Sequence, residues 1–130
     1  MQRIDSVYFA ESARGGRGVF TANAIDAGSV IEICPVIVLS KKDRRRIHET
    51  KLHDYYFLWG EEEKKAAIIL GFGFLYNHSY QPNAEYVPNY NDKTLTFYAK
   101  EPIAAGEEIT VNYSGDPEGN HKMWFEVKEA

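Results

Sequence analysis

Hydrophobic and polar residues alternate over several short stretches of this chain, a pattern typical of β-strands. It predicts strands at residues 5–11, 18–22, 84–90, 93–100 and 107–113. Asn91 and Asp92 separate the third and fourth of these, which predicts a hairpin or a long-loop β pair. A longer β-branched run at 29–39 contains Pro35, which indicates an edge strand, a bulge or two consecutive strands.

Two segments between these strands have a less regular pattern. Residues 41–57 have apolar residues at loose helical spacing, which predicts a short helix or a structured loop. Residues 61–74 can hold a helical turn before a buried strand. The charge run KKDRRR at 41–46 is typical of a solvated face, and contact with a substrate or partner is the less favoured interpretation.

One short pattern, Ile-x-Ala-Gly-x-x-Ile, occurs twice, at residues 25–31 and 103–109. Each glycine falls where a turn with positive φ precedes a predicted strand. Two copies predict two similar turn–strand units within one β-rich domain rather than a solenoid, which needs at least three repeats. No linker divides the chain, so we expect a single domain over residues 1–130 with its core at about 5–125.

Composition supports a packed domain and restricts its partners. The chain has 130 residues, of which 44% are hydrophobic and 14% aromatic, with nine tyrosines. The net charge of −4 gives no indication of a nucleic-acid-binding surface and suits a cationic partner such as a Lys/Arg-rich peptide.

Several kinds of protein are disfavoured. Cys34 is the single cysteine, which excludes an internal disulfide or a cysteine-based zinc cluster, and it reads as a buried small hydrophobe. No histidine spacing indicates a metal site. No apolar run approaches the ~20 residues of a membrane span, and no signal peptide is visible, so we expect an intracellular protein, cytoplasmic or nuclear.

Four stretches stand out as candidate functional regions, one of them DYYF (54–57), and the other three each have a structural alternative. The glycines of RGGRGVF (14–20) allow close approach of a ligand to the backbone, or simply form a tight turn. Asn77 and His78 lie in FLYNHSYQPNAEY, where they can form a binding site or an Asx-type turn. Tyr113 ends a predicted strand, where a lone tyrosine is usually half-buried.

Taken in order, RGGRGVF, FLYNHSYQPNAEY and GEEITVNYSGD resemble the motifs of SET domains, the protein-lysine methyltransferases that use S-adenosylmethionine. The resemblance spans roughly residues 5–125 and is strongest to the minimal viral and bacterial-type members. It implies a mainly β fold of several small curved sheets, few short helices and a C-terminal pseudoknot of the β-clip type. The pseudoknot would bring Asn77 and His78 beside Tyr113.

The resemblance also implies a cofactor site. The backbone of Gly15, Gly16 and Arg17 would bind S-adenosylmethionine, with the Asn77 side chain at its methionine end and the His78 backbone at the adenine. An aromatic residue after the last motif usually packs on the adenine, and Trp124 is the candidate, with Phe125 as the alternative.

The catalytic residue implied by the resemblance is Tyr113, whose hydroxyl would orient the lysine amine. Tyr55 and Tyr86 match positions that line the lysine channel. Val111 occupies a position that is often Tyr or Phe and limits how many methyl groups are added. A small valine leaves room for higher methylation, unless Tyr86 refills the space.

The chain differs from many relatives in having no cysteine-rich flanking modules, so residues 114–130 or a partner chain would supply the cofactor lid. Minimal members often pair, and we therefore expect a homodimer as one arrangement. The expected substrate is a lysine in a basic protein or peptide such as a histone tail, without direct nucleic-acid or membrane contact. Two alternatives remain: an inactive SET module that binds a peptide, and a structural β-rich domain whose tyrosines only pack.

Overall fold

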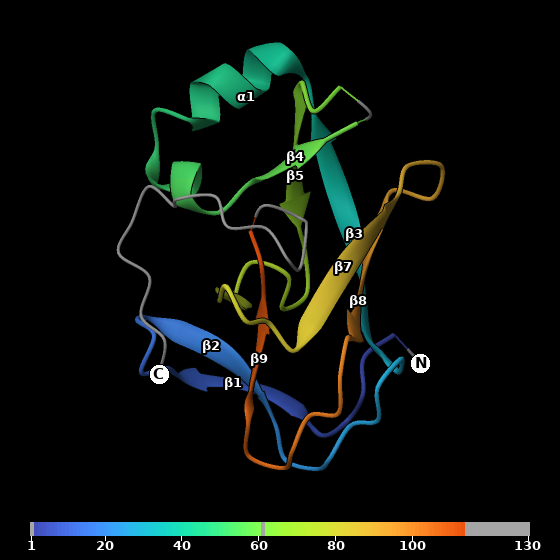
Figure 1. The fold of residues 1–130 in the computed structure, drawn as a ribbon. Coiled ribbons are helices and arrows are strands. Elements are labelled where there is room, and N and C mark those ends of the chain that lie inside the picture. The colour runs from blue at the N-terminus through green and yellow to red at the C-terminus, as the bar shows by residue number, and fades with distance from the viewer. Residues whose placement is uncertain (1, 61, 114–130) are drawn as a thin grey trace.

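The computed structural model describes residues 2–60 and 62–113 and is mainly β (Figure 1). The elements, in chain order, are β1 (Val7–Glu11), β2 (Arg17–Thr21), β3 (Val30–Leu39), α1 (Lys41–Ile47), the 3₁₀ helix η1 (Lys51–Asp54), β4 (Phe57–Trp59), β5 (Lys65–Ile69), β6 (Asn77–His78), β7 (Ala84–Asn89), β8 (Thr94–Ala99) and β9 (Glu108–Val111). No helix in these residues is long and apolar enough to cross a membrane.

The strands form two sheets. One has four strands in the order β1-β2-β9-β6, and the other has five in the order β4-β5-β3-β8-β7. In Figure 1 the β1–β2 pair lies at one end of the molecule and α1 at the other, and β9 leads from the first toward the second. The prediction of small sheets with few helices is therefore confirmed.

Pro35 marks a change of partner within β3. The strand pairs with β8 as far as Pro35 and with β5 from Val36 onward. The sequence left three interpretations open: an edge strand, a bulge or two consecutive strands. The last comes closest, because the partner changes at Pro35, although the backbone continues as one ten-residue strand. The predicted hairpin is confirmed, because β7 and β8 pair in register from Ala84–Ala99 to Asn89–Thr94.

The two less regular segments are now defined. Residues 41–57 hold α1, η1 and the start of β4. The buried strand in 61–74 is β5, but the predicted helical turn before it is wrong. The chain reverses there in a tight turn with positive φ at Gly60 and Glu63, because β4 and β5 form a hairpin.

The two copies of the repeated turn pair with each other. Ile25 and Ile103 exchange both backbone hydrogen bonds, at 2.8 and 2.9 Å. The amide of Gly28 donates to Ala99, and that of Gly106 donates to Thr21, the residue that corresponds to Ala99 in the other copy. The two glycines have nearly equal positive φ values of 84° and 85°. The predicted turn–strand units are therefore present, related by a local two-fold arrangement.

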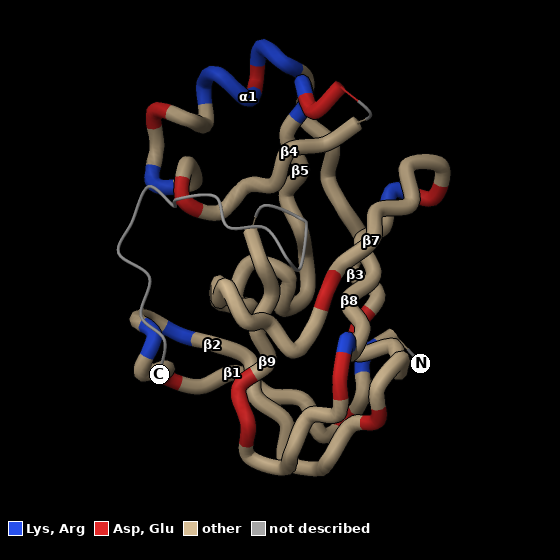
Figure 2. The backbone as a smooth tube through the Cα atoms, in the orientation of Figure 1, with Lys and Arg blue, Asp and Glu red and all other residues tan. Residues whose placement is uncertain are grey.

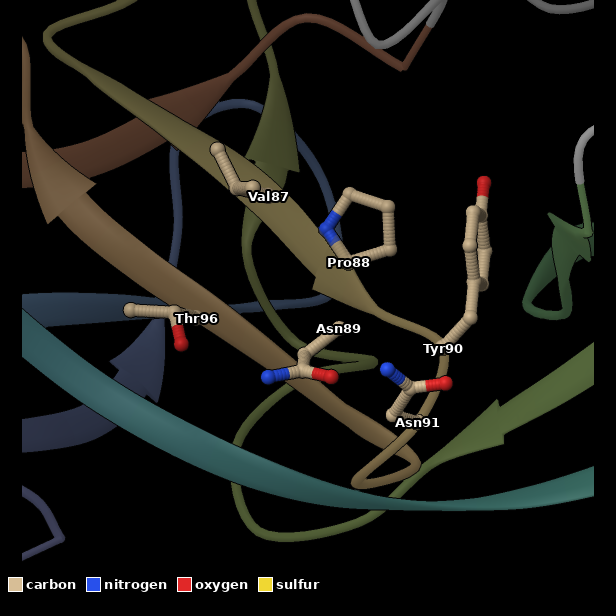
Figure 3. Close-up of a pocket in the computed structure, with 6 residues that line it drawn as sticks. All are labelled: Val87, Pro88, Asn89, Tyr90, Asn91 and Thr96. Carbon is tan, nitrogen blue, oxygen red and sulfur yellow. The ribbon is translucent and has the colours of Figure 1, made fainter.

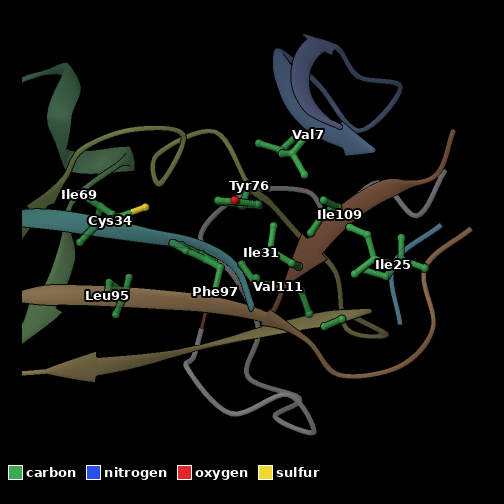
Figure 4. Close-up of a cluster of buried hydrophobic side chains, with 14 of the residues drawn as sticks. Val7, Ile25, Ile31, Cys34, Ile69, Tyr76, Leu95, Phe97, Ile109 and Val111 are labelled. Carbon is green, nitrogen blue, oxygen red and sulfur yellow. The ribbon is translucent and has the colours of Figure 1, made fainter. Parts of the chain in front are cut away.

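The core lies where the two units and both sheets meet (Figure 4). Its largest fully buried side chain is Tyr76, whose ring stacks on Phe97 with centroids 4.1 Å apart. Cys34 is fully buried, as the sequence predicts.

Candidate active site

The candidate site forms where β6 lies beside β9. The two strands run parallel, with Asn77 opposite Thr110 and His78 opposite Val111. This pairing brings Asn77 and His78, which are about 35 residues earlier in the chain, next to Tyr113, which follows β9 closely. The juxtaposition expected from the SET resemblance is present.

Tyr113 is held at both its backbone and its hydroxyl. Its backbone amide donates to His78 Nδ1 at 3.0 Å, and its hydroxyl donates to the carbonyl oxygen of Tyr76 at 2.8 Å. The family resemblance assigned a role to the His78 backbone alone. In the structure the His78 ring also fixes the backbone of Tyr113. These bonds leave the phenol with a defined orientation.

The ionisation of Tyr113 argues against a role as general base. Burial raises the pKa of its hydroxyl well above the usual value of a tyrosine, and Tyr55 and Glu108 raise it further. The group therefore stays protonated at neutral pH and acts as a hydrogen-bonding phenol.

An aromatic wall lies beside Tyr113, made of Tyr55, Phe57, Phe74 and Tyr86. The ring centroids of Tyr55 and Phe74 are 5.8 Å apart, and those of Phe57 and Tyr86 are 5.1 Å apart. The Tyr86 hydroxyl donates to the Tyr113 carbonyl oxygen at 3.4 Å, and burial raises the Tyr86 pKa. Tyr55 is 36% exposed, so the wall reaches the surface. The structure thus brings both tyrosines predicted for the channel together with Tyr113.

Val111 lies at the end of β9, and its predicted place in the lysine channel stays a prediction. Its side chain is fully buried in the hydrophobic core, and its carbonyl accepts the Ser79 amide at 2.9 Å. The small valine therefore packs the interior behind the site, and its influence on product methylation stays a prediction.

The glycine motif forms a tight loop between β1 and β2. Gly15 and Gly16 both have positive φ, and the Ser12 amide donates to the Gly16 carbonyl at 2.9 Å. Gly18 is required for another reason. A Cβ atom there would collide with the carboxylate of Glu108 and approach the Asn77 amide. The start of β2 can therefore lie directly against β6 and β9.

A hydrogen-bond network joins this loop to Asn77 through Glu108. Asn77 Nδ2 donates to Glu108 Oε2 at 2.8 Å and to the Arg17 carbonyl at 3.2 Å. The Ser12 hydroxyl donates to Glu108 Oε1 at 2.6 Å, and Arg14 Nε lies 3.5 Å from the same oxygen. Because its nitrogen is engaged, the Asn77 amide is oriented with Oδ1 as the group that can accept a hydrogen bond from a ligand.

Sequence reasoning missed the roles of Glu108 and Asn83. Asn83 Nδ2 donates to the Glu108 carbonyl at 2.8 Å, and its Oδ1 accepts the Thr110 amide at 2.9 Å. The side chain thus pairs with the edge of β9 as a neighbouring strand would. Glu108 lies within the motif GEEITVNY, which could have marked it as a site residue. Its partner Ser12 could not be identified in this way, because it is 96 residues away in the chain.

Trp124, its alternative Phe125 and the proposed lid at 114–130 lie outside the described residues. Among the residues that are described, no group of three or more His, Cys, Asp or Glu side chains could hold a metal ion.

A surface hollow of about 510 Å³ lies at the tip of the β7–β8 hairpin (Figure 3). Its lining includes Val87, Tyr90 and Thr96 but none of the predicted site residues. We therefore assign no role to it.

Known proteins similar to this chain agree on one family. The sequence model of the SET domain matches residues 16–114. The Schizosaccharomyces pombe protein named histone-lysine N-methyltransferase, H3 lysine-37 specific, is 32% identical over 117 residues, which cover 89% of this chain and 74% of that protein. Drosophila melanogaster histone-lysine N-methyltransferase trr is 28% identical over 127 residues, which cover 92% of this chain and 5% of that protein.

Solved structures have the same fold. A Plasmodium falciparum protein, described as a candidate histone methyltransferase, has a TM-score of 0.69 and 29% identity, with 96% of this chain and 100% of that chain covered. A humanized mutant of the Chaetomium thermophilum Polycomb Repressive Complex 2 has a TM-score of 0.70 and 23% identity, with 87% of this chain and 15% of that chain covered. The motifs, the β6–β9 junction and these similarities establish that the chain belongs to the SET-domain family.

Proposed function

We propose that this protein transfers a methyl group from S-adenosylmethionine to the side-chain amine of a lysine in a protein substrate. The observation that carries the proposal is the position of Tyr113, a partly buried phenol fixed between the Asn77–His78 strand and an aromatic wall that reaches the surface. Each of these parts lies on a different segment of the chain, and their convergence has no evident structural need.

The residues around the glycine loop suit this cofactor. Gly15 and Gly16 allow a ligand close access to the backbone, and Gly18 allows the adjoining start of β2 to lie against Asn77. Asn77 Oδ1 is an acceptor for an ammonium group, as the methionine end of the cofactor requires. When bound, the sulfonium supplies the methyl group, which a neutral amine accepts as the carbon–sulfur bond breaks.

The aromatic wall suits the other reactant. A free lysine has a pKa near ~10.4, so its amine is mostly protonated at neutral pH. An apolar channel lowers that pKa by desolvation. Rings such as Tyr55 and Tyr86 also attract a methylated ammonium product by cation–π interaction, worth ~0.5–2 kcal/mol each. Both effects favour a lysine side chain over other nucleophiles.

Tyr113 would position the amine rather than remove its proton. Its hydroxyl donates to the Tyr76 carbonyl, so its oxygen is presented as an acceptor toward the amine or the transferring methyl. Holding two reactants in line can supply ~7–11 kcal/mol of the barrier reduction. The raised pKa of Tyr113 is consistent with this role and not with proton abstraction.

For the substrate, we propose a basic protein segment, with the histone H3 tail as the first one to test. The support is the similarity to a relative named for histone H3 lysine 37, together with the chain's net negative charge. A homodimer and an intracellular location are further proposals that rest on the sequence resemblance alone.

The proposal is tested by calorimetric titration of the protein with S-adenosylmethionine, followed by radiolabelled methyl transfer onto histone H3 and a cognate lysate. We expect saturable cofactor binding and a labelled band in which mass spectrometry identifies a methylated lysine. Binding without transfer would favour the inactive peptide-binding module. Absence of binding at millimolar cofactor would contradict the enzyme proposal.

A further inference from the structure

The outer face of α1 is uniformly basic, although the protein as a whole is acidic. Residues 41–46 contain five cations and one carboxylate, so this segment has a net charge of +4 and the rest of the chain −8, against the total of −4. Figure 2 shows the cationic residues along α1 at one end of the molecule. The net charge of −4, which gave no indication of a nucleic-acid-binding surface, does not reveal this uneven distribution of charge.

Helical geometry explains which side chains point outward. At about 100° per residue, Lys41, Arg45, Lys42 and Arg46 lie at about 0°, 40°, 100° and 140° around the helix. All four are exposed, whereas Asp43, Arg44 and Ile47 on the opposite side are partly buried. We refer to the four exposed residues as the basic face.

The inner side of α1 is attached to the β4–β5 turn. Arg44 donates through Nη1 to the carbonyl oxygens of Glu63 and Lys64, at 2.9 and 3.2 Å. Arg44 therefore has a structural role and is not part of the basic face. The basic face has a single ion pair in the described residues, a 3.7 Å contact between Arg46 and Asp43 that is open to solvent.

The basic face makes the helix locally less stable. Lys41 and Lys42 lie in the first turn, where the helix dipole disfavours cations. Lys41 precedes Arg45 by four residues, and Lys42 precedes Arg46 by four, and each like-charge pair is destabilising by ~0.2–0.5 kcal/mol. A solvated surface helix has no need of this arrangement, so it indicates an anionic partner.

The composition of the face identifies the kind of partner. It has no apolar member, which a protein interface needs at its centre, and no aromatic ring for stacking single-stranded bases. Four flexible cations on one helical surface suit regularly spaced phosphates. We propose that the basic face of α1 binds the sugar–phosphate backbone of duplex DNA without sequence preference. The acidic remainder of the chain would be repelled, so DNA would approach this end alone.

The position of α1 gives such binding a use. The chain passes from α1 through η1 directly to Tyr55, the exposed member of the aromatic wall. DNA bound on the basic face would therefore place a DNA-associated protein near the proposed lysine channel. The binding itself does not depend on methyl transfer, so the two proposals can fail separately.

The test measures fluorescence anisotropy of a labelled duplex of about 25 base pairs, without cofactor, from 50 to 200 mM salt. Four phosphate contacts predict a slope of about −3.6 in log K against log salt, with affinity in the range of ~10⁻⁴–10⁻⁶ M. The variant Lys41→Glu/Lys42→Glu should bind roughly tenfold or more weakly, with a slope shallower by about two. The same variant should unfold at an equal or higher temperature, because it creates two Glu–Arg pairs and suits the dipole.

The matched control is Lys93→Glu/Lys100→Glu, which changes net charge equally at exposed positions on the β7–β8 side. Its DNA affinity should stay within about twofold of the parent. Failure of the parent to bind duplex DNA at low salt would overturn the proposal, as would equal weakening by both variants. Binding of polyglutamate without binding of DNA would assign the face to an acidic protein and would overturn it too.

Discussion

The two copies of the repeated turn begin alike but lead to different regions of the molecule. After Gly28 the chain enters β3, where Glu32 is buried in the interior. After Gly106 it enters β9, where Glu108 faces the glycine loop and Asn77. The turns themselves share the same φ and the same hydrogen bonds. Local sequence thus determines the turn, and the partners of the following strand determine what the strand does.

The two carboxylates show this difference most clearly. Glu32 accepts from the Tyr76 hydroxyl at 2.8 Å, the Phe72 amide at 3.0 Å and Arg3 at 3.3 Å, and it is only 3% exposed. Tyr76 belongs to the core and Phe72 is partly buried, whereas the Arg3 side chain is 40% exposed and covers the carboxylate from the surface. Glu108 instead engages the side-chain nitrogen of Asn77, the residue proposed to hold the methionine end of the cofactor. We therefore expect Glu32 to govern stability and Glu108 to govern cofactor binding.

The largest effect is expected for Glu32→Ala. The substitution leaves Arg3, the Tyr76 hydroxyl and the Phe72 amide without their acceptor, so it should lower the free energy of unfolding by about 3 kcal/mol or more. Glu32→Gln keeps an acceptor oxygen and should lose less. Urea denaturation measures both, and a loss below about 1 kcal/mol for the alanine variant would contradict the role of Glu32.

Glu108→Gln should weaken cofactor binding more than it lowers the free energy of unfolding. It removes the charged acceptor shared by Asn77 and Ser12, and hydrogen bonds to charged groups are worth ~1.5–3 kcal/mol. We expect the dissociation constant for S-adenosylmethionine to rise by roughly tenfold, with a smaller change in unfolding free energy than for Glu32→Ala. Calorimetry would speak against this assignment if cofactor affinity were unchanged while stability fell.

Substituting each repeated glycine tests the equivalence of the turns. Gly28 and Gly106 have positive φ, and a Cβ at either position meets no atom within 4 Å. Gly28→Ala and Gly106→Ala should therefore lose similar stability, about 1 kcal/mol each, from backbone strain alone. Thermal unfolding of the matched pair would reveal any inequality, which would mean that the turns are not equivalent.

The last comparison concerns alkaline pH, where each region contributes a tyrosine, Tyr76 fully buried and Tyr113 partly buried. Burial raises the pKa of Tyr76 and of Tyr113 above the usual value near ~10. Above about pH 10 the unfolded chain releases these protons first, so stability is present below that pH and is lost as pH rises toward the folded pKa values. Urea titrations from pH 8 to 11 should show this loss. Tyr113→Phe should remove part of it, and an unchanged slope would argue against the raised Tyr113 pKa.

Strand positions, the β7–β8 hairpin and the repeated turns could be predicted, because alternation and turn residues are local signals. The helical turn expected before β5 was wrong, because a short polar segment with few apolar positions does not distinguish a helix from a hairpin turn. Tyr55, Tyr86, Asn77, His78 and Tyr113 could be placed near one another only through the family resemblance. The bonds of Glu108 to Ser12 and Asn77 join residues that periodicity cannot relate.

The central claim is that the segment formed by β9 and the residues after it positions the catalytic residue Tyr113, whereas β3 supports only the fold. The most direct test is single-turnover methyl transfer by Tyr113→Phe at saturating S-adenosylmethionine, beside calorimetric binding of the cofactor. We predict that the rate falls roughly a hundredfold or more, as when one positioned hydrogen-bonding group is removed from an active site. The cofactor dissociation constant should stay within about threefold, because Asn77 and the glycine loop are intact. A full rate, or a loss of binding that matches the loss of rate, would contradict the account.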